Sequence, residues 1–261
     1  MSNQNGTQAV DRAARLLSEV VHSPDPMTFT GLSAATGLAK STTSRLLLAL
    51  ERNGLVRRDN HGRFLPGEMF VSFACRGGAE AGLIAVAQPF LDRLGKATGE
   101  TINLGVASAG MVEQIAQVDS TYLIGGTNWV GLSVPLHCSA SGKVLLASGA
   151  AQLPPERKLE RRTDKTITTE AALKADLAAV RARGYAVTDE ELEPGLIAVA
   201  APVHSVDGSV VAALSVSGPT TRMTKEHTMM AAERCMAEAV GLSAVLGYRQ
   251  RIGRGRKAGA A

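Results

Sequence analysis

The sequence lacks any long hydrophobic run. Among its 261 residues, no apolar stretch approaches the ~20 residues that a membrane-spanning helix needs. The chain begins with MSNQNGTQAVDRAARLL, which is polar and then amphipathic, without the apolar segment or the small-residue cleavage site of a secretory signal. We therefore expect a cytoplasmic protein that has no membrane partner.

Cysteine is scarce as well. The three cysteines, Cys75, Cys138 and Cys235, are odd in number, far apart and never in a CxxC pair. This pattern argues against a disulfide framework and against a zinc ribbon. We interpret the cysteines as buried structural thiols.

Histidines at metal-ligand spacing are also missing. The candidate ligands His137, His204 and His227 are widely scattered. An acidic cluster that could suggest a metal site or an acid–base pair consists of Asp189, Glu190, Glu191 and Glu193. Because no histidine stands at ligand spacing from this cluster, we expect neither a metal site nor a cofactor.

A net positive charge is absent from most of the chain. The 28 basic and 24 acidic residues give a net charge of +4, but five basic residues lie close to the end: Arg249, Arg251, Arg254, Arg256 and Lys257. Without these five, 23 basic residues face 24 acidic ones. We expect residues 249–261 to form a basic disordered tail, which either attracts phosphate without sequence preference or keeps the chain soluble.

What is present is a globular composition with a patterned beginning. Apolar residues over 7–22 repeat at intervals of three and four, which predicts an amphipathic helix. A short helix is expected over about 31–36 with Thr30 as its cap, then a turn at Gly37 and a longer helix over about 40–53. Helix, glycine turn and helix in this order predict a helix-turn-helix.

A hairpin is expected directly after these helices. Residues 55–58 and 63–65 resemble strands, and the turn-forming segment 59–62 joins them, which is typical of a wing. Residues 67–86 are expected to be helical and to connect the halves, although Gly77-Gly78 weakens one long straight helix.

The second half alternates helices and strands. Helices are expected near 89–98, 139–148, 169–183 and 224–247, and strands near 101–107, 112–118, 185–188, 196–204 and 209–217. This order predicts an α+β fold with one mostly antiparallel sheet and helices packed against it. The expected divisions are a DNA-binding domain at 7–67, a linker helix at 68–87, a second domain at 88–248 and the tail at 249–261.

The longer helix of the helix-turn-helix has two different sides. Thr43, Leu46, Leu47 and Leu50 cluster on one side at ~100° per residue, and we expect that side to pack into the core. The opposite side carries short hydroxyls and arginines, with Leu48 among them. We predict that DNA is contacted by Lys40, Ser41, Thr42, Ser44, Arg45 and, on the wing, Arg57, Arg58 and Arg63.

Longer motifs resemble a known family. Residues 8–66 contain QAVDRAARLL and LSAATGLAKSTTSRLLLALERNGLVRRD, and the second half contains PLHCSASGKVLLA, RGYAVTDEELEPGLIAVAAPV and GSVVAALSVSGPTTRMT. Together they resemble the isocitrate lyase regulator (IclR) family of transcription factors. The resemblance implies a winged helix-turn-helix followed by a GAF-like, profilin-like effector-binding domain. It also implies homodimers, often as dimers of dimers, that bind near-palindromic operator DNA and respond to small organic or aromatic acids.

The predicted effector site begins at the 139–143 loop. This loop is not a Walker motif, because His137 stands where that motif has a glycine and Val144 stands where it has Ser or Thr. The backbone N–H groups of the loop nevertheless lie at a predicted helix N-terminus, which attracts anions. The resemblance implies two further site positions on neighbouring strands, where family members that bind small oxoacids carry polar groups. This chain has Thr188 and Ala198 at these positions. Their low polarity favours an aromatic acid or amide over a small dianion. The predicted residues are Trp129, Ser139, Ala140, Ser141, Thr188, Glu191, Ala198, Ser215 and Ser217.

Three functions remain open from the sequence. The leading hypothesis is a ligand-responsive transcription regulator, a repressor, that is not an enzyme. The second is a hydrolytic or acyl-handling enzyme that uses the 139–143 loop; a nucleophilic pair of His137 and Cys138 is not expected, because adjacent residues on an extended segment point in opposite directions. The third is an architectural DNA-binding protein without an effector.

Overall fold

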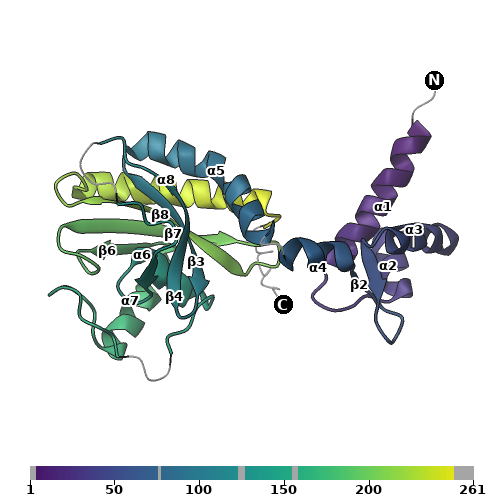
Figure 1. The fold of residues 1–261 in the computed structure, drawn as a ribbon, viewed down its shortest axis with the longest axis horizontal. Coiled ribbons are helices and arrows are strands. Elements are labelled where there is room, and N and C mark those ends of the chain that lie inside the picture. Colours follow the sequence, from purple (N-terminus) through teal and green to yellow (C-terminus); the bar gives the residue numbers. More distant parts are fainter. Residues whose placement is uncertain (1–3, 76–77, 123–126, 155–157, 250–261) are drawn as a thin grey trace, which may run out of the picture. The chain divides into compact units, whose positions relative to one another are not determined.

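The computed structural model describes residues 4–75, 78–122, 127–154 and 158–249 (Figure 1). The chain divides into two compact units, residues 1–82 and 83–261. Most of the basic tail that was predicted at 249–261 lies outside the described residues. No helix in the described part is both long and apolar enough to cross a membrane.

The first unit is a helix-turn-helix with a wing, as predicted. Its elements are α1 (Gln4–His22), α2 (Phe29–Thr36), α3 (Lys40–Arg52), β1 (Val56–Arg58), β2 (Phe64–Pro66) and α4 (Glu68–Cys75). The antiparallel hairpin β1–β2 closes over a core that Leu16, Leu32, Leu47 and Phe64 share. Gly37 has a positive φ of 68°, which a side chain would disfavour, and this lets the chain turn sharply from α2 into α3.

The start of α2 corrects the predicted cap. The helix begins at Phe29, and Thr28 rather than Thr30 caps it, since the Thr28 hydroxyl accepts a hydrogen bond of 3.1 Å from the Gly31 N–H. Thr28 has the extended backbone that a cap requires, whereas Thr30 already lies in the helix.

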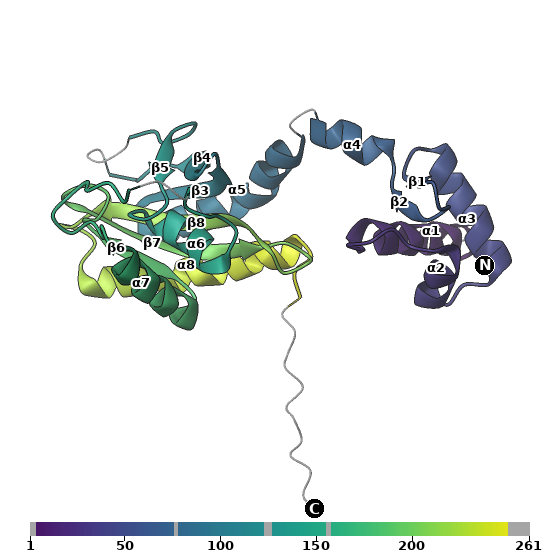
Figure 2. The same cartoon turned by 90° about the horizontal axis from the view of Figure 1, so that it is seen from below.

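The second unit is a six-stranded antiparallel sheet between two helical layers (Figures 1 and 2). The strands are β3 (Thr101–Ser108), β4 (Met111–Val118), β5 (Ser133–Pro135), β6 (Ala186–Asp189), β7 (Leu196–His204) and β8 (Val210–Pro219), in the spatial order β5-β4-β3-β8-β7-β6. Helices α5 (Gly78–Thr98) and α8 (Lys225–Val245) cover one face. Helices α6 (Ala140–Ser148) and α7 (Glu170–Arg183) cover the other, where the candidate site lies.

Two elements differ from the prediction. Helix α5 begins at Gly78 and continues through Pro89, whereas the sequence predicted a new helix beginning at Pro89. Burial of Ala87, Leu91 and Leu94 in the main core outweighs the ~3 kcal/mol that an interior proline costs. Strand β5 was not predicted, because three residues are too few to show an alternating pattern.

Candidate DNA-binding surface and effector site

The exposed side of α3 presents the predicted DNA-binding residues. Thr43, Leu47 and Leu50 are buried, while Lys40, Ser41, Ser44 and Arg45 are exposed and Thr42 is half-buried. The N-cap residue, Ala39, makes no side-chain hydrogen bond to the helix. The first N–H groups of α3 are therefore left without a side-chain cap, and such groups bind phosphate well.

The arginines of this surface fall into two groups. Arg58 lies 3.2 Å from Glu51 and stacks over the Phe64 ring, and Arg63 lies 2.7 Å from Asp59. The side chains of Arg45 and Arg57 form no ion pair or hydrogen bond within the described part of the chain. Their guanidinium groups are therefore the ones most available to an external anion.

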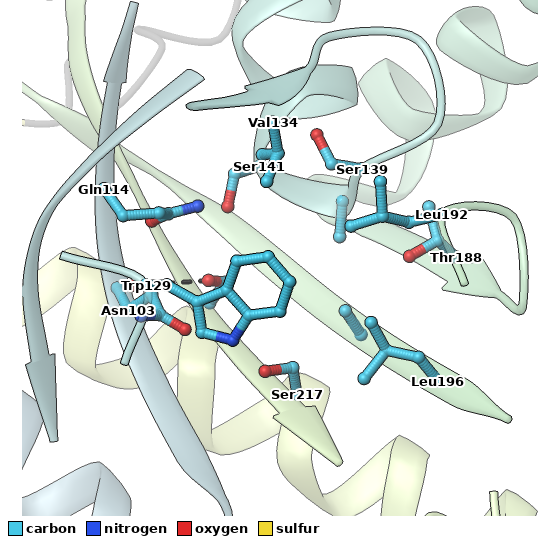
Figure 3. Close-up of a pocket in the computed structure, with 13 residues that line it drawn as sticks. Asn103, Gln114, Trp129, Val134, Ser139, Ser141, Thr188, Leu192, Leu196 and Ser217 are labelled. Carbon is cyan, nitrogen blue, oxygen red and sulfur yellow. Dashed lines mark hydrogen bonds between the residues drawn. The ribbon is translucent and has the colours of Figure 1, made fainter. Parts of the chain in front are cut away.

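A small cavity of about 50 Å³ opens on the α6 face of the sheet in the second unit (Figure 3). It is lined by Asn103, Gln114, Trp129, Val134, Ser139, Ala140, Ser141, Thr188, Leu192, Leu196, Ala198, Ser215 and Ser217. Every predicted effector residue except Glu191 is in this set. None of the lining side chains is charged.

The sheet register explains how distant segments converge here. Thr188 on β6 pairs with Ala198 on β7, which pairs with Ser217 on β8, so the three lie in one row across the sheet. In the next row Asn103 on β3 lies opposite Ser215, whose hydroxyl donates to the Asn103 carbonyl over 3.4 Å. The floor of the cavity therefore combines four strands.

The N-terminus of α6 forms the wall opposite this floor. The Ser139 hydroxyl donates to the Pro135 carbonyl over 2.6 Å and accepts from the Gly142 N–H over 3.2 Å. Gly142 packs so closely on the Leu136 backbone that a Cβ atom would collide with it. These contacts fix a helix N-terminus, with its partial positive charge, at the edge of the cavity.

Trp129 crosses the cavity. Its indole lies between Asn103 and Gln114 on one side and Ser217 and Leu196 on the other (Figure 3). The Trp129 backbone N–H donates to Gln117 Oε1 over 2.9 Å, and the same oxygen accepts from Asn103 Nδ2. The loop that carries the indole is thus attached to β3 and β4 by side-chain hydrogen bonds.

Sequence comparison then identifies the family. Residues 9–60 match the IclR helix-turn-helix domain, and residues 79–244 match the bacterial transcriptional regulator IclR C-terminal domain. The chain belongs to the IclR family. It is a transcription regulator with a DNA-binding helix-turn-helix.

Characterised relatives of this IclR-family regulator span most of its length. It is 35% identical over 234 residues to the HTH-type transcriptional regulator BhcR of Paracoccus denitrificans, covering 85% of this chain and 81% of that one. It is 32% identical over 234 residues to the transcriptional repressor IclR of Escherichia coli K12, covering 84% and 83%.

Solved structures give the same assignment. The IclR structure of Thermotoga maritima aligns with a TM-score of 0.59 and 27% identity, over 93% of this chain and all of that one. An IclR homologue from Microbacterium hydrocarbonoxydans complexed with 4-hydroxybenzoate aligns with a TM-score of 0.58 and 25% identity, over 91% and 98% of the two chains.

The sequence of this IclR-family chain predicted Glu191 in the effector site, but Glu191 does not line the cavity. Its Oε1 lies 2.6 Å from the ammonium group of Lys143, and Asp176 Oδ2 lies 2.7 Å from the same group as an ion pair without hydrogen-bond geometry. Burial raises the pKa of Glu191 against the lowering effect of Lys143. Glu191 therefore anchors α6, whose N-terminus borders the cavity.

Two further carboxylates of the acidic cluster, those of Asp189 and Glu190, pair with a lysine. Lys165 lies 2.6 Å from Glu190 and 3.2 Å from Asp189, and the hydrogen bond from Lys165 lowers the pKa of Glu190. No group of three potential metal ligands occurs among the residues that the structure describes.

His137 and Cys138 lie in a turn rather than on the extended segment that the sequence suggested. The imidazole Nε2 of His137 lies 3.0 Å from the Glu160 carbonyl. Desolvation raises the pKa of Cys138 to about 11, so the buried thiol stays protonated near neutral pH. Cys235 is also free and buried, which agrees with a structural role for both thiols.

Sequence reasoning missed five lining residues: Asn103, Gln114, Val134, Leu192 and Leu196. A signal was present for two of them, because Asn103 and Gln114 are amides within otherwise largely apolar strands. Both are buried, and Gln114 Oε1 has no hydrogen-bond partner in the described structure. Buried polar groups of this kind need an explanation, and a nearby binding site is one.

Proposed function

We propose that the chain is a repressor whose operator binding is controlled by a small molecule held in the Trp129 cavity. The observation that carries this proposal is the cavity itself, which joins a helix N-terminus to hydroxyls on the sheet. The hydroxyls of Ser141, Thr188 and Ser217 make no hydrogen bond within the described residues. Two kinds of relative are named as repressors, and one structural neighbour is complexed with an aromatic acid.

The cavity favours a ligand with at most one negative charge. No cation lines it, so a dianion would lose its hydration without gaining a counter-charge. The N-terminus of α6 and the free hydroxyls suit one carboxylate or amide, and Leu192, Leu196 and Trp129 suit an apolar body. Because only about 50 Å³ is open beside the indole, a ligand of ring size has to displace Trp129. We propose an aromatic or aliphatic monocarboxylic acid or amide.

The DNA partner is proposed to be a palindromic operator bound by a homodimer. One recognition helix reads only a few base pairs, so specific binding requires two helices about one DNA turn apart. Helix α4 offers a surface for self-association, since Met69 and Phe73, four residues apart on one side of the helix, are each more than half exposed. We also propose that two such dimers associate into a dimer of dimers and that the protein acts in the cytoplasm.

An enzymatic role at the 139–143 loop has less support. The Ser139 hydroxyl is engaged as the cap of α6, and its own proton goes to the Pro135 carbonyl. The neighbouring Cys138 is protonated near neutral pH. The relatives that span this chain are regulators rather than enzymes.

The decisive experiment follows the single tryptophan. Aromatic and aliphatic monocarboxylates and amides are titrated while the emission of Trp129 and the release of operator DNA are recorded. We expect the effector to change both signals. Ser217→Ala should weaken the binding of the effector by roughly tenfold, the value of one lost hydrogen bond.

Ser209→Ala, at an exposed hairpin, provides the matched control and should behave as the parent. DNA release that persists unchanged in both Ser215→Ala and Ser217→Ala would place the effector site elsewhere. Footprinting with no preferred site would instead support an architectural DNA-binding protein.

A further inference from the structure

A single exposed apolar side chain lies among the predicted DNA-contacting residues of α3. Leu48 is 50% exposed, whereas Leu47 and Leu50 on the opposite side of α3 are buried. It contributes nothing to the core of the first unit, which is built from other residues. The fold therefore does not explain a leucine at this position.

The surroundings of Leu48 are polar on every turn of the helix. Ser44 and Arg45 precede it by four and three residues, and Glu51 and Arg52 follow it by three and four, so all four are its neighbours on the helix surface. Ser44, Arg45 and Arg52 are exposed, and Arg45 has no partner in the described structure. The result is one apolar side chain framed by hydroxyl and guanidinium groups, with the one neighbouring carboxylate, that of Glu51, paired with Arg58.

Only one group on a major-groove base edge is complementary to such a side chain. Guanine, adenine and cytosine present hydrogen-bond donors or acceptors there, and only thymine adds an apolar group, its C5 methyl. The hydroxyls and guanidinium groups beside Leu48 are suited to phosphates and to guanine, whereas Leu48 can bury only a methyl.

We propose that Leu48 is a specificity-determining residue that reads the C5 methyl of a thymine in each operator half-site. The inference deepens the proposed operator binding and rests on it. A lone exposed leucine surrounded by charges does not form the continuous apolar patch that a protein partner would need. DNA is therefore the occupant that its surroundings favour.

The experiment removes the methyl group and nothing else. The full-length chain selects its preferred site from random DNA, and each thymine of that site is then replaced in turn by deoxyuridine, which lacks only the C5 methyl. We expect one thymine in each half-site at which the replacement weakens binding by about fourfold, the value of one buried methyl-sized group. Leu48→Ala should bind the thymine and uracil sites equally, and Leu48→Met, which keeps an apolar side chain of similar length, should restore the difference.

Val240→Ala, at an exposed apolar position on α8 in the second unit, is the control and should keep the parent's response to uracil. A parent chain that tolerates uracil at every position, or a Leu48→Ala variant that still discriminates thymine from uracil, would overturn the proposal for Leu48 while leaving operator recognition intact. Selection that yields no preferred site would overturn both.

Discussion

At the scale of single residues, the arginines of the first unit are expected to have three different roles. Arg45 lies on α3, where base edges are the expected partners, and Arg57 lies on the wing, where phosphates are the expected partners. Arg63 is different again, because its ion pair with Asp59 helps to hold the wing turn, where Asp59 also accepts from two backbone N–H groups. Substitution of Arg63 therefore disturbs the wing itself and is a poor probe of phosphate contact.

Arg45→Ala and Arg57→Ala should separate specificity from general attraction. Arg45→Ala is expected to weaken operator binding by ~1–3 kcal/mol per half-site and to relax the base preference, because a guanidinium can bind guanine through two hydrogen bonds. Arg57→Ala should weaken all sequences alike and flatten the dependence of affinity on salt. Fluorescence anisotropy on operator and scrambled DNA at several salt concentrations measures both. Parent-like operator affinity in Arg45→Ala would show that the predicted orientation of α3 on DNA is wrong.

Lys143 is the buried cation of the second unit, with 1% of its side chain exposed. Lys143→Met should reduce the free energy of unfolding by ~3–5 kcal/mol, because it leaves the carboxylates of Asp176 and Glu191 without their cation. Urea unfolding at neutral pH measures the loss. Adding Glu191→Gln to Lys143→Met should recover part of it, and a double variant less stable than Lys143→Met would contradict this account.

Glu191 gives the second unit a specific dependence on pH. Burial raises its folded-state pKa above the ordinary value of 4.5, although Lys143 opposes the shift and Asp176 and Asp189 reinforce it. The folded state then holds a proton that the unfolded state has released, so the stability due to Glu191 is complete below pH 4.5 and is lost as pH rises through the raised pKa. The difference in unfolding free energy between parent and Glu191→Gln should therefore fall with rising pH. Chemical denaturation across this window measures it, and a difference that rises would refute the sign.

At the scale of elements, the position of α6 determines whether the cavity exists. Gly142→Ala places a Cβ atom against the Leu136 backbone, so the helix N-terminus has to move away from the sheet. We expect a loss of ~1–3 kcal/mol in stability and a loss of effector binding, with DNA binding retained because the first unit has its own core.

Gly184→Ala is the matched control for Gly142→Ala. Gly184 ends α7 with a φ of 83° and open space around it, so an alanine there costs ~1–2 kcal/mol of backbone strain without touching the cavity. Urea unfolding and Trp129 emission together distinguish the two variants. Equal effector affinity in both would show that α6 does not shape the site.

The elements that sequence predicted well carry local signals. The helix-turn-helix could be recognised from its apolar periodicity and Gly37, and the end of α7 from Gly184. The same local logic misplaced the start of α5, where Pro89 resembles a helix beginning but packing in the core keeps the helix intact. Local signals thus decide helix ends only where tertiary packing does not oppose them.

The candidate site was only partly predictable for a different reason. Ser139 to Ser141 and Ser217 belong to motifs that can be read along the chain, whereas Asn103 and Gln114 reach the cavity through strand pairing. A bulge between Leu104 and Gly105 shifts the β3–β4 register and sets Gln114 opposite Gly105, which no local pattern encodes. The pairing of Glu191 could not be predicted, because Lys143 and Asp176 come from two distant helices.

At the scale of the whole molecule, the chain has two units with separate cores, and we propose that one binds DNA and the other the ligand. The first unit is built around Leu16, Leu32 and Phe64, and the second around the two faces of its sheet. A monomer would bring one recognition helix to DNA, so the proposed operator binding depends on self-association. The exposed apolar side chains of α4 are the feature of the first unit that offers it.

Phe73→Asp should therefore weaken both assembly and operator binding. Phe73 is 55% exposed on α4, so the folded unit tolerates a charge there, whereas an apolar interface between two copies does not. We expect analytical ultracentrifugation to show a shift from dimer towards monomer. Operator affinity should fall at least about tenfold, because two helices no longer bind as one unit, while the effector still changes the emission of Trp129.

Met229→Asp, a similarly exposed apolar position on α8, tests whether any added charge has this effect. A Phe73→Asp chain that stays dimeric and binds operator as the parent does would show that the interface does not involve α4. A parent chain that is monomeric on operator DNA would show that operator binding needs no dimer interface.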